Sequence, residues 1–573
     1  MTRRPTARLR AITPYAVPRL PTPIDLPLDG NEGPAPEAER LAEEAGPLAA
    51  AISRYPDPSA LQQLWADRLG VPPERVRITA GADEALDRII RAFVGPGREM
   101  LTTAPTFEMF ERYCALAGGR YVDVPWTGGP LPLEALLSRV TRRTGVIAIA
   151  TPNNPTGTCA STGALLELSA RAPDVVVLVD LAYVEFADED PTSALLERPN
   201  VMLTRTVSKA RGLAGLRVGC AAGPADLVGW LRAAGNPYSV SGLSLAVAAA
   251  SFRSDERRVN EAVAEVRRER EALARLLAPL ASRVWPSQAN FVLAEFPKVR
   301  WTWEALAGLG IGVRCFPGRP YLENALRIAC PGNAADFARL ERGLRAVLEP
   351  QALLFDMDGV VADVSASYDE AIVQTAAAFG AAIDRGEIAA ARARGGANND
   401  WEVTRRLMAA HGVEQPLEAV TARFEQIYQG SKESPGAPGL CERERLIPAP
   451  PLLERLAARL PLGIVTGRPR RDAIRFLDRC GLRDRFSVLV TMEDGPLKPD
   501  AAPVRLALER LGVGRAWMVG DTPDDMRAAR SAGVVPIGIV APGHAPETMR
   551  GALFEAGAGR VLGDLAELEE LLP

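Results

Sequence analysis

Apolar runs and amphipathic segments alternate along the first 350 residues of the chain. Short apolar runs at residues 146–150 and 175–179 predict buried strands, because a strand covered on both faces is apolar throughout. Helical spacing of apolar positions predicts helices over residues 82–93, 131–141 and 255–277. This alternation is typical of an α/β domain.

A second alternation begins after a predicted helix at residues 335–348, which ends at Glu349-Pro350. A mostly helical stretch reaches to about residue 430, and a Pro/Gly-rich segment at 434–451 follows it. We therefore place a domain boundary near Pro350, which divides the chain into residues 1–350 and 351–573. Strands and helices of the second part are predicted at 352–355, 462–465, 473–479, 488–490, 502–511, 516–519 and 524–531.

Composition narrows the classes of protein that need to be considered. The 573 residues exceed what one core usually holds, and 47% hydrophobic with 24% charged residues is ordinary globular composition. No stretch approaches the roughly 20 apolar residues of a membrane helix, and the basic start MTRRPTARLR lacks the apolar core of a signal peptide. A net charge of −4 argues against nucleic-acid binding. Seven cysteines without a CxxC pair argue against disulfides or a zinc site, so we expect a cytoplasmic protein.

Lysine and histidine are scarce, which makes their positions informative. Of 67 basic residues only four are lysines, and there are two histidines. A histidine-rich metal site is therefore excluded. The lysines could be retained for chemistry or could be what an arginine bias leaves, and the motifs around them decide. These residues are Lys209, Lys298, Lys432, Lys498, His411 and His544.

Three segments of the first part form one constellation. They are Thr151-Pro-Asn-Asn-Pro-Thr-Gly157, Asp180 with Tyr183 after an apolar strand, and the stretch from Ser208 to Gly219. In the order Asn, Asp, Tyr, Lys, Arg they closely resemble a fold-type I pyridoxal-phosphate aminotransferase. The resemblance implies a large α/β domain at about 30–245. It also implies a small domain built from the N-terminal segment and about 246–349.

The resemblance assigns roles that suit the residue types. Lys209 supplies an amine that can condense with the cofactor's aldehyde, a reaction that arginine cannot perform. Asp180 would keep the pyridine nitrogen protonated, so that the ring can accept charge. Asn154 and Tyr183 would bond to the phenolate oxygen. Ser208 and Arg217 would bind the cofactor phosphate, aided by the backbone amides of Ala82 and Asp83 at a predicted helix start after residues 76–79.

Within this superfamily, residues 10–345 are most similar to histidinol-phosphate aminotransferases. The similarity rests on Ile12-Thr-Pro-Tyr15, Arg54-Tyr-Pro-Asp57, Pro105-Thr-Phe-Glu-Met109 and the spacing of Gly312-Val-Arg314 with Leu326-Arg-Ile328, together with Asn31-Glu32, Gly81-Ala-Asp-Glu84 and Ala289-Asn-Phe291. It implies that Tyr55 reaches the cofactor phosphate of a neighbouring subunit in a homodimer. Tyr15, Arg314 and Arg327 would bind the substrate phosphate or the glutamate carboxylate.

Some positions depart from the family's pattern. Phe107 stands where a ring-stacking tyrosine is usual, Leu181 replaces an acidic residue, and residues 326–332 depart from the usual continuation. Core transamination chemistry is retained. The amino acceptor stays open, because the family includes relatives that act on aromatic and other substrates.

The second part carries another ordered set of motifs. Leu353-Leu-Phe-Asp-Met-Asp-Gly-Val360 is followed by Gly463-Ile-Val-Thr-Gly-Arg468, Leu497-Lys-Pro-Asp500 and Met518-Val-Gly-Asp-Thr-Pro-Asp-Asp525. Over about 352–570 this set resembles a haloacid-dehalogenase-like phosphatase. The resemblance implies a Rossmann-like domain whose helical insert, about 366–450, is a cap over the site.

This family likeness implies a mechanism for phosphate-ester hydrolysis. Asp356 would be the nucleophile, and Asp358 would protonate the leaving oxygen and later activate water. Mg²⁺ would be held by Asp356, the Asp358 carbonyl and Asp521, since it prefers oxygen ligands. Asp525 would orient Lys498 or a metal-bound water, with Asp524 as the less favoured candidate. Thr466 and Lys498 would hold the phosphoryl group.

Other sequence features have structural rather than catalytic interpretations. Residues 394–401 are either a specificity loop or an exposed turn. His411 and His544 are expected at the surface, and Lys298 and Lys432 are expected to be solvated. Gly557-Ala-Gly559 is expected to be a turn rather than part of a dinucleotide motif.

Three functional hypotheses follow. The first is a bifunctional enzyme that makes histidinol phosphate from imidazole acetol phosphate and glutamate and then removes the phosphate. The second keeps both chemistries but uses another phosphorylated amino ketone or amino alcohol. The third makes the C-terminal part a non-catalytic module, against which its complete motif set argues.

Overall fold

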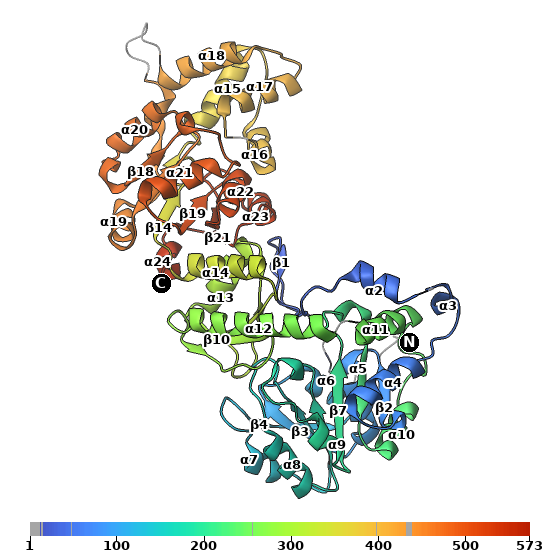
Figure 1. Ribbon diagram of the computed structural model, residues 1–573. Coiled ribbons are helices and arrows are strands. Elements are labelled where there is room, and N and C mark those ends of the chain that lie inside the picture. Colours follow the sequence, from blue (N-terminus) through green and yellow to red (C-terminus); the bar gives the residue numbers. More distant parts are fainter. Residues whose placement is uncertain (1–11, 13–14, 47, 255, 397, 431–437) are drawn as a thin grey trace, which may run out of the picture. The chain divides into compact units, whose positions relative to one another are not determined.

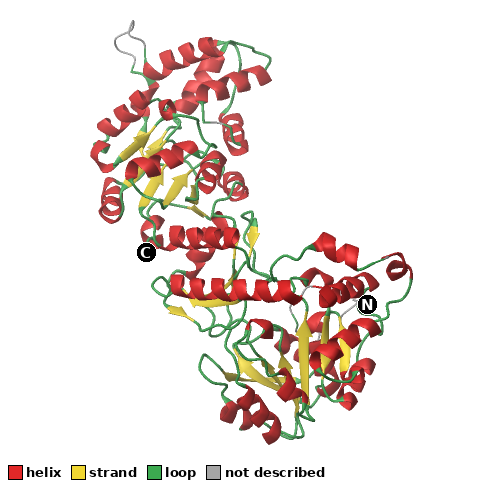
Figure 2. Cartoon of the chain, viewed as in Figure 1, coloured by secondary structure: helices red, strands yellow, loops and turns green. Residues whose placement is uncertain are grey.

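The computed structural model describes residue 12 and residues 15–46, 48–254, 256–396, 398–430 and 438–573 (Figure 1). The chain forms two compact units. The first takes in the described residues up to Pro18, Leu28–Pro297 and Val313–Ala338. The second takes in Arg19–Pro27, Lys298–Gly312 and Arg339–Pro573. Each unit has strands flanked by helices (Figure 2), which confirms the predicted α/β class.

The first unit is built on a large, mostly parallel sheet. Its order is β2 (Val76–Thr79), β8 (Gly219–Ala222), β7 (Val201–Thr206), β6 (Val176–Asp180), β5 (Thr144–Ala150), β3 (Glu99–Ala104) and β4 (Arg120–Pro125). β8 runs antiparallel to its two neighbours, β2 and β7, and the other neighbouring pairs are parallel. Alternate residues of β5 enter two separate core clusters: Ile147 and Ile149 join one, while Val146 and Ala148 join the other. The predicted buried strands are thus confirmed, because helices cover both faces of the sheet.

A second, antiparallel sheet lies in the same unit. Its order is β12 (Arg314–Cys315), β13 (Ala325–Ala329), β10 (Phe291–Glu295) and β9 (Arg283–Val284). The helix α12 (Glu256–Leu277) contacts β10. Arg314 and Arg327 are direct partners in the register of β12 and β13. Opposed residues of an antiparallel pair project to the same face, so the register brings the two arginines together.

One predicted helix of this unit is wrong in length. The pattern at residues 131–141 forms only α7 (Leu133–Leu137). The backbone N–H of Thr141 donates to Thr144 Oγ1 at 2.9 Å, and β5 begins at Thr144. The helix has already ended at Ser138, whose Oγ donates to the Ala135 carbonyl at 2.8 Å, so a local side-chain bond competes with the helix there.

The second unit contains a parallel sheet in the order β18 (Val488–Val490), β17 (Leu462–Val465), β14 (Ala352–Phe355), β19 (Ala516–Gly520), β20 (Val535–Ile539) and β21 (Arg560–Leu562). Its helices include α20 (Arg470–Arg479), α21 (Ala502–Leu511) and α22 (Pro523–Ser531). The predicted strands 352–355, 462–465 and 488–490 are confirmed at both ends.

A helical insert follows the first strand of this sheet. The chain enters and leaves it through the antiparallel pair β15 (Ala362–Asp363) and β16 (Arg445–Leu446). The insert consists of α15 (Tyr368–Ala378), α16 (Arg385–Arg394), α17 (Asp400–Ala410) and α18 (Leu417–Gln429), which we call the cap helices. Lys432 lies outside the described residues.

Segments from before Pro350 pack within the second unit. The helix α13 (Val299–Gly308) contacts β20 and β21. A Cβ at Gly559 would lie 2.7 Å from the Glu304 carbonyl oxygen, so the expected turn at Gly557-Ala-Gly559 also permits this close approach. Trp517 Nε1 donates to the Ala346 carbonyl at 2.9 Å, within α14 (Ala334–Leu348). The boundary near Pro350 stays a prediction.

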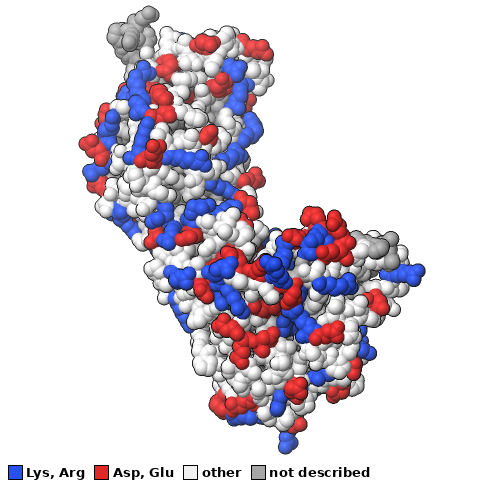
Figure 3. Space-filling model, viewed as in Figure 1, with Lys and Arg blue, Asp and Glu red and all other residues white. Residues whose placement is uncertain are grey.

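Surface and membrane features are unremarkable. Basic and acidic side chains are interspersed over the face shown in Figure 3. None of the helices in the described ranges is both long and apolar enough to cross a membrane. Lys298 was expected to be solvated; it is partly exposed, and its ammonium group also donates to the Leu572 carbonyl.

Candidate active sites

A cavity of about 860 Å³ lies in the first unit. It opens where β3, β5, β6 and β7 end, because Asp180 and the loops after the other strands line it. Carboxyl ends of parallel strands are the usual place for a ligand in such sheets. The predicted residues that line it are Tyr15, Ala82, Asp83, Phe107, Asn154, Asp180, Tyr183, Ser208, Lys209, Arg217, Arg314 and Arg327.

Tyr55 is the predicted residue that the structure does not bring to this cavity. Its side chain is 81% exposed and stacks on Tyr238, with ring centroids 4.7 Å apart. Ile52 and Trp230 are also strongly exposed in this unit. Tyr55 therefore does not line the cavity of its own chain.

The amine of Lys209 is held by a neighbouring loop. Nζ donates to the Asn31 carbonyl at 2.7 Å, and the Asn31 amide donates to the Tyr183 hydroxyl at 3.1 Å. Asn31 has φ 58°, and a Cβ at Gly33 would lie 1.6 Å from the Lys209 carbonyl oxygen. Asn31 and Gly33 thus let the loop approach the lysine closely. The Asn31-Glu32 motif contributes to the family resemblance, but the sequence did not indicate that this loop holds Lys209.

Asp180 lies buried at the end of β6. Its Oδ1 accepts from Thr204 Oγ1 at 2.8 Å and from the Ala182 N–H at 3.2 Å. Burial raises the pKa of this carboxyl to about 6, although the Thr204 bond opposes the shift. A buried carboxylate of this kind is stabilised by a cationic partner, and a protonated pyridine nitrogen meets that requirement.

An anion-binding corner lies at the start of α5 (Gly81–Phe93). Gly81 has φ +77°, and a Cβ there would lie 2.8 Å from Arg217 Nη2. Arg217 also donates to Asp83 Oδ2 at 3.0 Å, and Ser208 lines the same cavity. Free backbone amides at a helix start, a hydroxyl and a guanidinium are a donor set that fits a phosphate group. Together with Lys209 and Asp180, these residues fit pyridoxal phosphate.

The cavity also contains the arginine pair, whose surroundings we call the arginine end of the cavity. Arg327 Nη1 donates to Asn154 Oδ1 at 2.6 Å and Nη2 to the Asp29 carbonyl at 2.7 Å. Arg314 Nη2 pairs with Glu108 Oε1 at 2.9 Å. Within the described chain, the buried Arg314 Nη1 and Arg327 Nε have no hydrogen-bond partner, so both can serve an anionic ligand.

Glu108 and Arg319 also belong to this end of the cavity, although sequence reasoning missed both roles. The Glu108 carboxylate bridges Arg314 and Arg319, whose Nη2 lies 2.9 Å from Glu108 Oε2. Burial raises the pKa of the Tyr15 hydroxyl, with Arg314 opposing and Glu108 reinforcing the shift. The site thus holds its own carboxylate where a substrate anion is expected.

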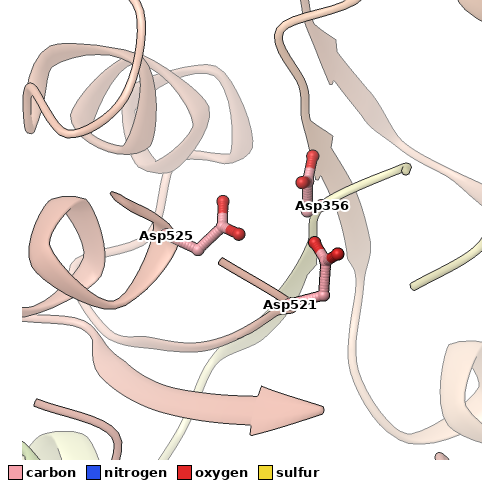
Figure 4. Close-up of side chains that lie close together, drawn as sticks. All are labelled: Asp356, Asp521 and Asp525. Carbon is pink, nitrogen blue, oxygen red and sulfur yellow. The ribbon is translucent and has the colours of Figure 1, made fainter. Parts of the chain in front are cut away.

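The second unit has a buried carboxylate cluster. Oxygen atoms of Asp356, Asp521 and Asp525 all lie within 4.8 Å of one another, and the side chains converge in Figure 4. Asp356 follows β14, Asp521 follows β19, and Asp525 lies in the first turn of α22. Lys498 Nζ lies 2.9 Å from Asp356 and 2.5 Å from Asp525.

This cluster fits a divalent cation. Three carboxylates face one ammonium group, and the buried Asp521 Oδ1 has no hydrogen-bond partner in the described chain. Burial raises the pKa of Asp356 to about 7, with Lys498 opposing, and raises that of Asp521 well above its usual value. Hard oxygen ligands carrying excess negative charge are what Mg²⁺ requires.

Asp358 points away from the cluster. Gly359, with φ +72°, turns the chain after β14, and a Cβ there would lie 2.2 Å from Asp521 Oδ2. The Asp358 carboxylate accepts from Arg468 Nε, so its side chain lies outside the carboxylate cluster. Thr466, at the end of β17, is buried and accepts from the Arg468 N–H at 3.2 Å. The side chain of Asp358 thus pairs with Arg468 instead of joining the carboxylates that could hold a metal ion.

The described residues of the segment 394–401 favour the specificity loop over the exposed turn. The Gly396 N–H donates to Asp524 Oδ2 at 2.6 Å, and the Asn398 amide donates to the same oxygen at 2.8 Å and to the Lys498 carbonyl at 2.9 Å. The residues at 398–401 line a small cavity together with Asp358. Asp524 therefore anchors the cap segment and is not part of the carboxylate cluster.

The two histidines differ in their surroundings. His411 is exposed and lies 2.7 Å from Glu387, as expected for a surface residue. His544 is half-buried, and its Nδ1 is buried without a hydrogen-bond partner in the described chain, so the surface expectation is wrong. Burial lowers the pKa of His544, and Arg392 lowers it further.

Comparison with known proteins finds a family match in each of the two parts of the sequence. The family described as aminotransferase class I and II matches residues 25–344, and the haloacid dehalogenase-like hydrolase family matches residues 350–533. A histidinol-phosphate aminotransferase of Anaeromyxobacter sp. is 37% identical over 306 residues, covering 52% of this chain and 83% of the relative.

Two further relatives add to this. An imidazoleglycerol-phosphate dehydratase of Phytophthora nicotianae is 44% identical over 240 residues, covering 39% of this chain and 52% of the relative, so the chain spans about half of that protein. The crystal structure of Sinorhizobium meliloti histidinol-phosphate aminotransferase, in complex with pyridoxal-5'-phosphate, matches with a TM-score of 0.54 at 27% identity. That match covers 60% of this chain and 97% of the other. The chain therefore belongs to the class I and II aminotransferases, with histidinol-phosphate aminotransferases among its relatives, and continues into a haloacid dehalogenase-like hydrolase domain.

Proposed function

We propose that the protein is a bifunctional enzyme whose aminotransferase converts imidazole acetol phosphate and glutamate to histidinol phosphate and 2-oxoglutarate. The observation that carries this proposal is one cavity containing Lys209, the buried Asp180 and the arginine pair Arg314 and Arg327. The similarity of the chain to a histidinol-phosphate aminotransferase, over most of that relative's length, supports the choice of substrate.

The residues of the cavity divide the work of transamination. Pyridoxal phosphate, when bound, supplies a ring that accepts the charge left on the substrate's α-carbon. The Lys209 amine would hold the cofactor through its aldehyde and, when free of it, would move the proton at the substrate's α-carbon. Asp180 keeps a positive charge on the ring nitrogen, because its own buried carboxylate needs a cationic partner. Arg314 and Arg327 hold the anionic end of either substrate.

The hydrolase domain is proposed to act on a phosphate monoester, with histidinol phosphate as the substrate. Asp356 attacks phosphorus while the ester P–O bond breaks, and Asp358 gives its proton to the departing alcohol oxygen. Asp358 then takes a proton from water, whose oxygen attacks phosphorus and releases phosphate from Asp356. Mg²⁺, held by Asp356, the Asp358 carbonyl and Asp521 with Asp525 nearby, would neutralise phosphate charge.

A reaction sequence supports pairing the two activities. Dehydration of imidazoleglycerol phosphate yields the keto phosphate that the aminotransferase would use. A relative named as an imidazoleglycerol-phosphate dehydratase is 44% identical to this chain over 240 residues. Transamination then produces a phosphorylated amino alcohol, which is a phosphate monoester and thus the class of compound that the hydrolase chemistry consumes.

A second substrate remains a candidate because of specific residues. Phe107 lacks the usual hydroxyl, and Glu108 with Arg319 adds charges to the substrate end of the cavity. These residues favour another phosphorylated amino ketone as the substrate if imidazole acetol phosphate is converted slowly. The non-catalytic hypothesis is disfavoured by the convergence of Asp356, Asp521 and Lys498 in one cluster.

A homodimer is part of the proposal. Tyr55, Tyr238, Trp230 and Ile52 are exposed apolar or aromatic residues of the first unit, and such residues are enriched in subunit interfaces. Burial of these side chains against a second copy would let Tyr55 reach the neighbouring cofactor site.

The decisive experiment supplies the purified protein with imidazole acetol phosphate, glutamate, pyridoxal phosphate and Mg²⁺. Histidinol is the expected product, and accumulation of histidinol phosphate alone would contradict the coupled activity. Lys209→Ala should abolish the first step, whereas Asp356→Asn should block only phosphate release. A panel of keto acids and phosphate esters tests the second substrate hypothesis, which a clear preference for imidazole acetol phosphate would count against.

A further inference from the structure

Arg468 joins two carboxylates inside the hydrolase domain. It is 2% exposed and lies in the loop between β17 and α20. Its Nε donates to Asp358 Oδ1, and its Nη1 donates to Glu444 Oε2 at 3.1 Å. A buried arginine between two buried or half-buried carboxylates is fixed in position, since moving it would leave charges unpaired.

Glu444 is in turn held by the insert that carries the cap helices. Its Oε1 accepts from the Tyr428 hydroxyl at 2.8 Å and from Ser367 Oγ at 3.2 Å. Ser367 follows β15 and Glu444 precedes β16, which are the two places where the chain passes between the sheet domain and the cap helices. Tyr368, the first residue of α15, places its ring centroid 5.0 Å from the Arg468 guanidinium carbon.

We propose that Arg468 is a positioning residue for phosphate-ester hydrolysis, aligning Asp358 with the leaving oxygen only when Glu444 and the cap helices are in place. The inference rests on the proposed phosphatase function. Because Arg468 holds Oδ1 of Asp358, the other carboxylate oxygen carries the proton. It would deliver this proton in the cavity that Asp358, Arg468 and Trp401 line. The structure thus links closure of the cap to the acid that releases the alcohol.

Leaving-group dependence separates this role from a general structural one. An alkyl phosphate releases a strongly basic alkoxide, which needs the proton from Asp358, whereas p-nitrophenyl phosphate releases a stable phenolate that needs it far less. Arg468→Met should therefore lower kcat for an alkyl phosphate about 100-fold, within the range of general-acid contributions. The same substitution should lower kcat for p-nitrophenyl phosphate only a few-fold. Arg468→Lys should recover part of the alkyl-phosphate activity.

Two further variants test the chain of contacts. Glu444→Gln keeps the side-chain size but loses the charge that fixes Arg468, and it should give the same selective loss to a smaller degree. The double variant Asp358→Asn with Arg468→Met should be no slower on alkyl phosphate than Asp358→Asn alone, because both changes remove one function. Arg483→Met is the matched control, since 47% of the Arg483 side chain is exposed and it pairs with Asp478 of α20 rather than with a cap helix.

The outcomes are distinguishable. If the wild-type protein hydrolyses neither ester with Mg²⁺, the proposed phosphatase function fails. If the wild-type protein is active but Arg468→Met, Arg468→Lys and Glu444→Gln lower both esters equally, the positioning role is overturned. Thermal unfolding of each variant shows whether it folds, and Arg468→Lys and Glu444→Gln carry the test if the methionine variant does not.

Discussion

We predict that Glu108 competes with the substrate anion for the arginine end of the aminotransferase cavity. Its carboxylate lies 2.9 Å from both Arg314 and Arg319, and Arg314 and Glu108 side chains are 7% and 22% exposed. A charged hydrogen bond in such surroundings contributes about 1–2 kcal/mol after allowance for the partial exposure. A substrate anion that binds Arg314 through both the unpartnered Nη1 and the Nη2 that pairs with Glu108 must first break this contact.

Substitution of Glu108 by glutamine removes the competing charge while keeping the shape of the side chain. We expect Glu108→Gln to lower the KM for glutamate about 5- to 30-fold, which is the same 1–2 kcal/mol expressed as affinity. The effect on a dianionic phosphate should be smaller, because a dianion displaces the carboxylate more readily. Steady-state transamination at saturating keto phosphate measures the KM for glutamate directly.

Glu111→Gln is the matched control for this measurement. Glu111 is 55% exposed and lies 3.3 Å from Arg319, so it should change the KM little. An unchanged or increased KM for glutamate in Glu108→Gln, with the wild-type fold retained, would refute the competition. It would show instead that Glu108 orients Arg314 for the substrate.

Three other perturbations test different parts of the structure. Trp517→Ala should destabilise the second unit by about 3–5 kcal/mol, because it leaves a cavity at a fully buried site and removes the hydrogen bond to the Ala346 carbonyl. Urea unfolding followed by fluorescence should show this as a lower midpoint. Gly359→Ala should abolish phosphate release but spare transamination, since the added methyl group would lie 2.2 Å from an Asp521 oxygen; retained phosphatase activity would contradict the described turn. Mg²⁺ affinity measured by calorimetry should weaken as the pH falls below about 7, because burial raises the pKa of Asp356 to about 7 and the protonated carboxyl cannot bind the ion. An affinity independent of pH between 6 and 8 would count against Asp356 as a ligand.

Local signals account for the parts of the site that were predicted. Asp180, Asp356 and Asp521 each follow a run of apolar residues, and the end of a buried parallel strand is where a ligand site forms. Lys209 lies in a motif whose residues are close in sequence. Short-range patterns of this kind fix the element and the place of the side chain on it, and the family resemblance supplies the role of each residue.

Contacts between distant segments could not be predicted in this way. Glu108 and Arg314 are 206 positions apart, and Arg468 and Asp358 are 110 positions apart. Neither glutamate nor arginine is unusual in a chain with 67 basic and 71 acidic residues, so no composition signal marked them. The role of Gly559 was equally hidden, because it depends on the close approach of the Glu304 carbonyl, which only the packing reveals.

The scarcity of lysine has a physical explanation at Lys498. Its ammonium group lies 2.9 Å from Asp356, 2.5 Å from Asp525 and 3.0 Å from the Val465 carbonyl. Three donors meet three acceptors around one compact charge, and a planar guanidinium could not direct its donors to these positions. Burial alone would lower the pKa of Lys498, yet the two carboxylates raise it above its usual value, so the charge is retained. In a chain that uses arginine almost everywhere else, the geometry of the acceptors around position 498, rather than the charge alone, thus selects lysine.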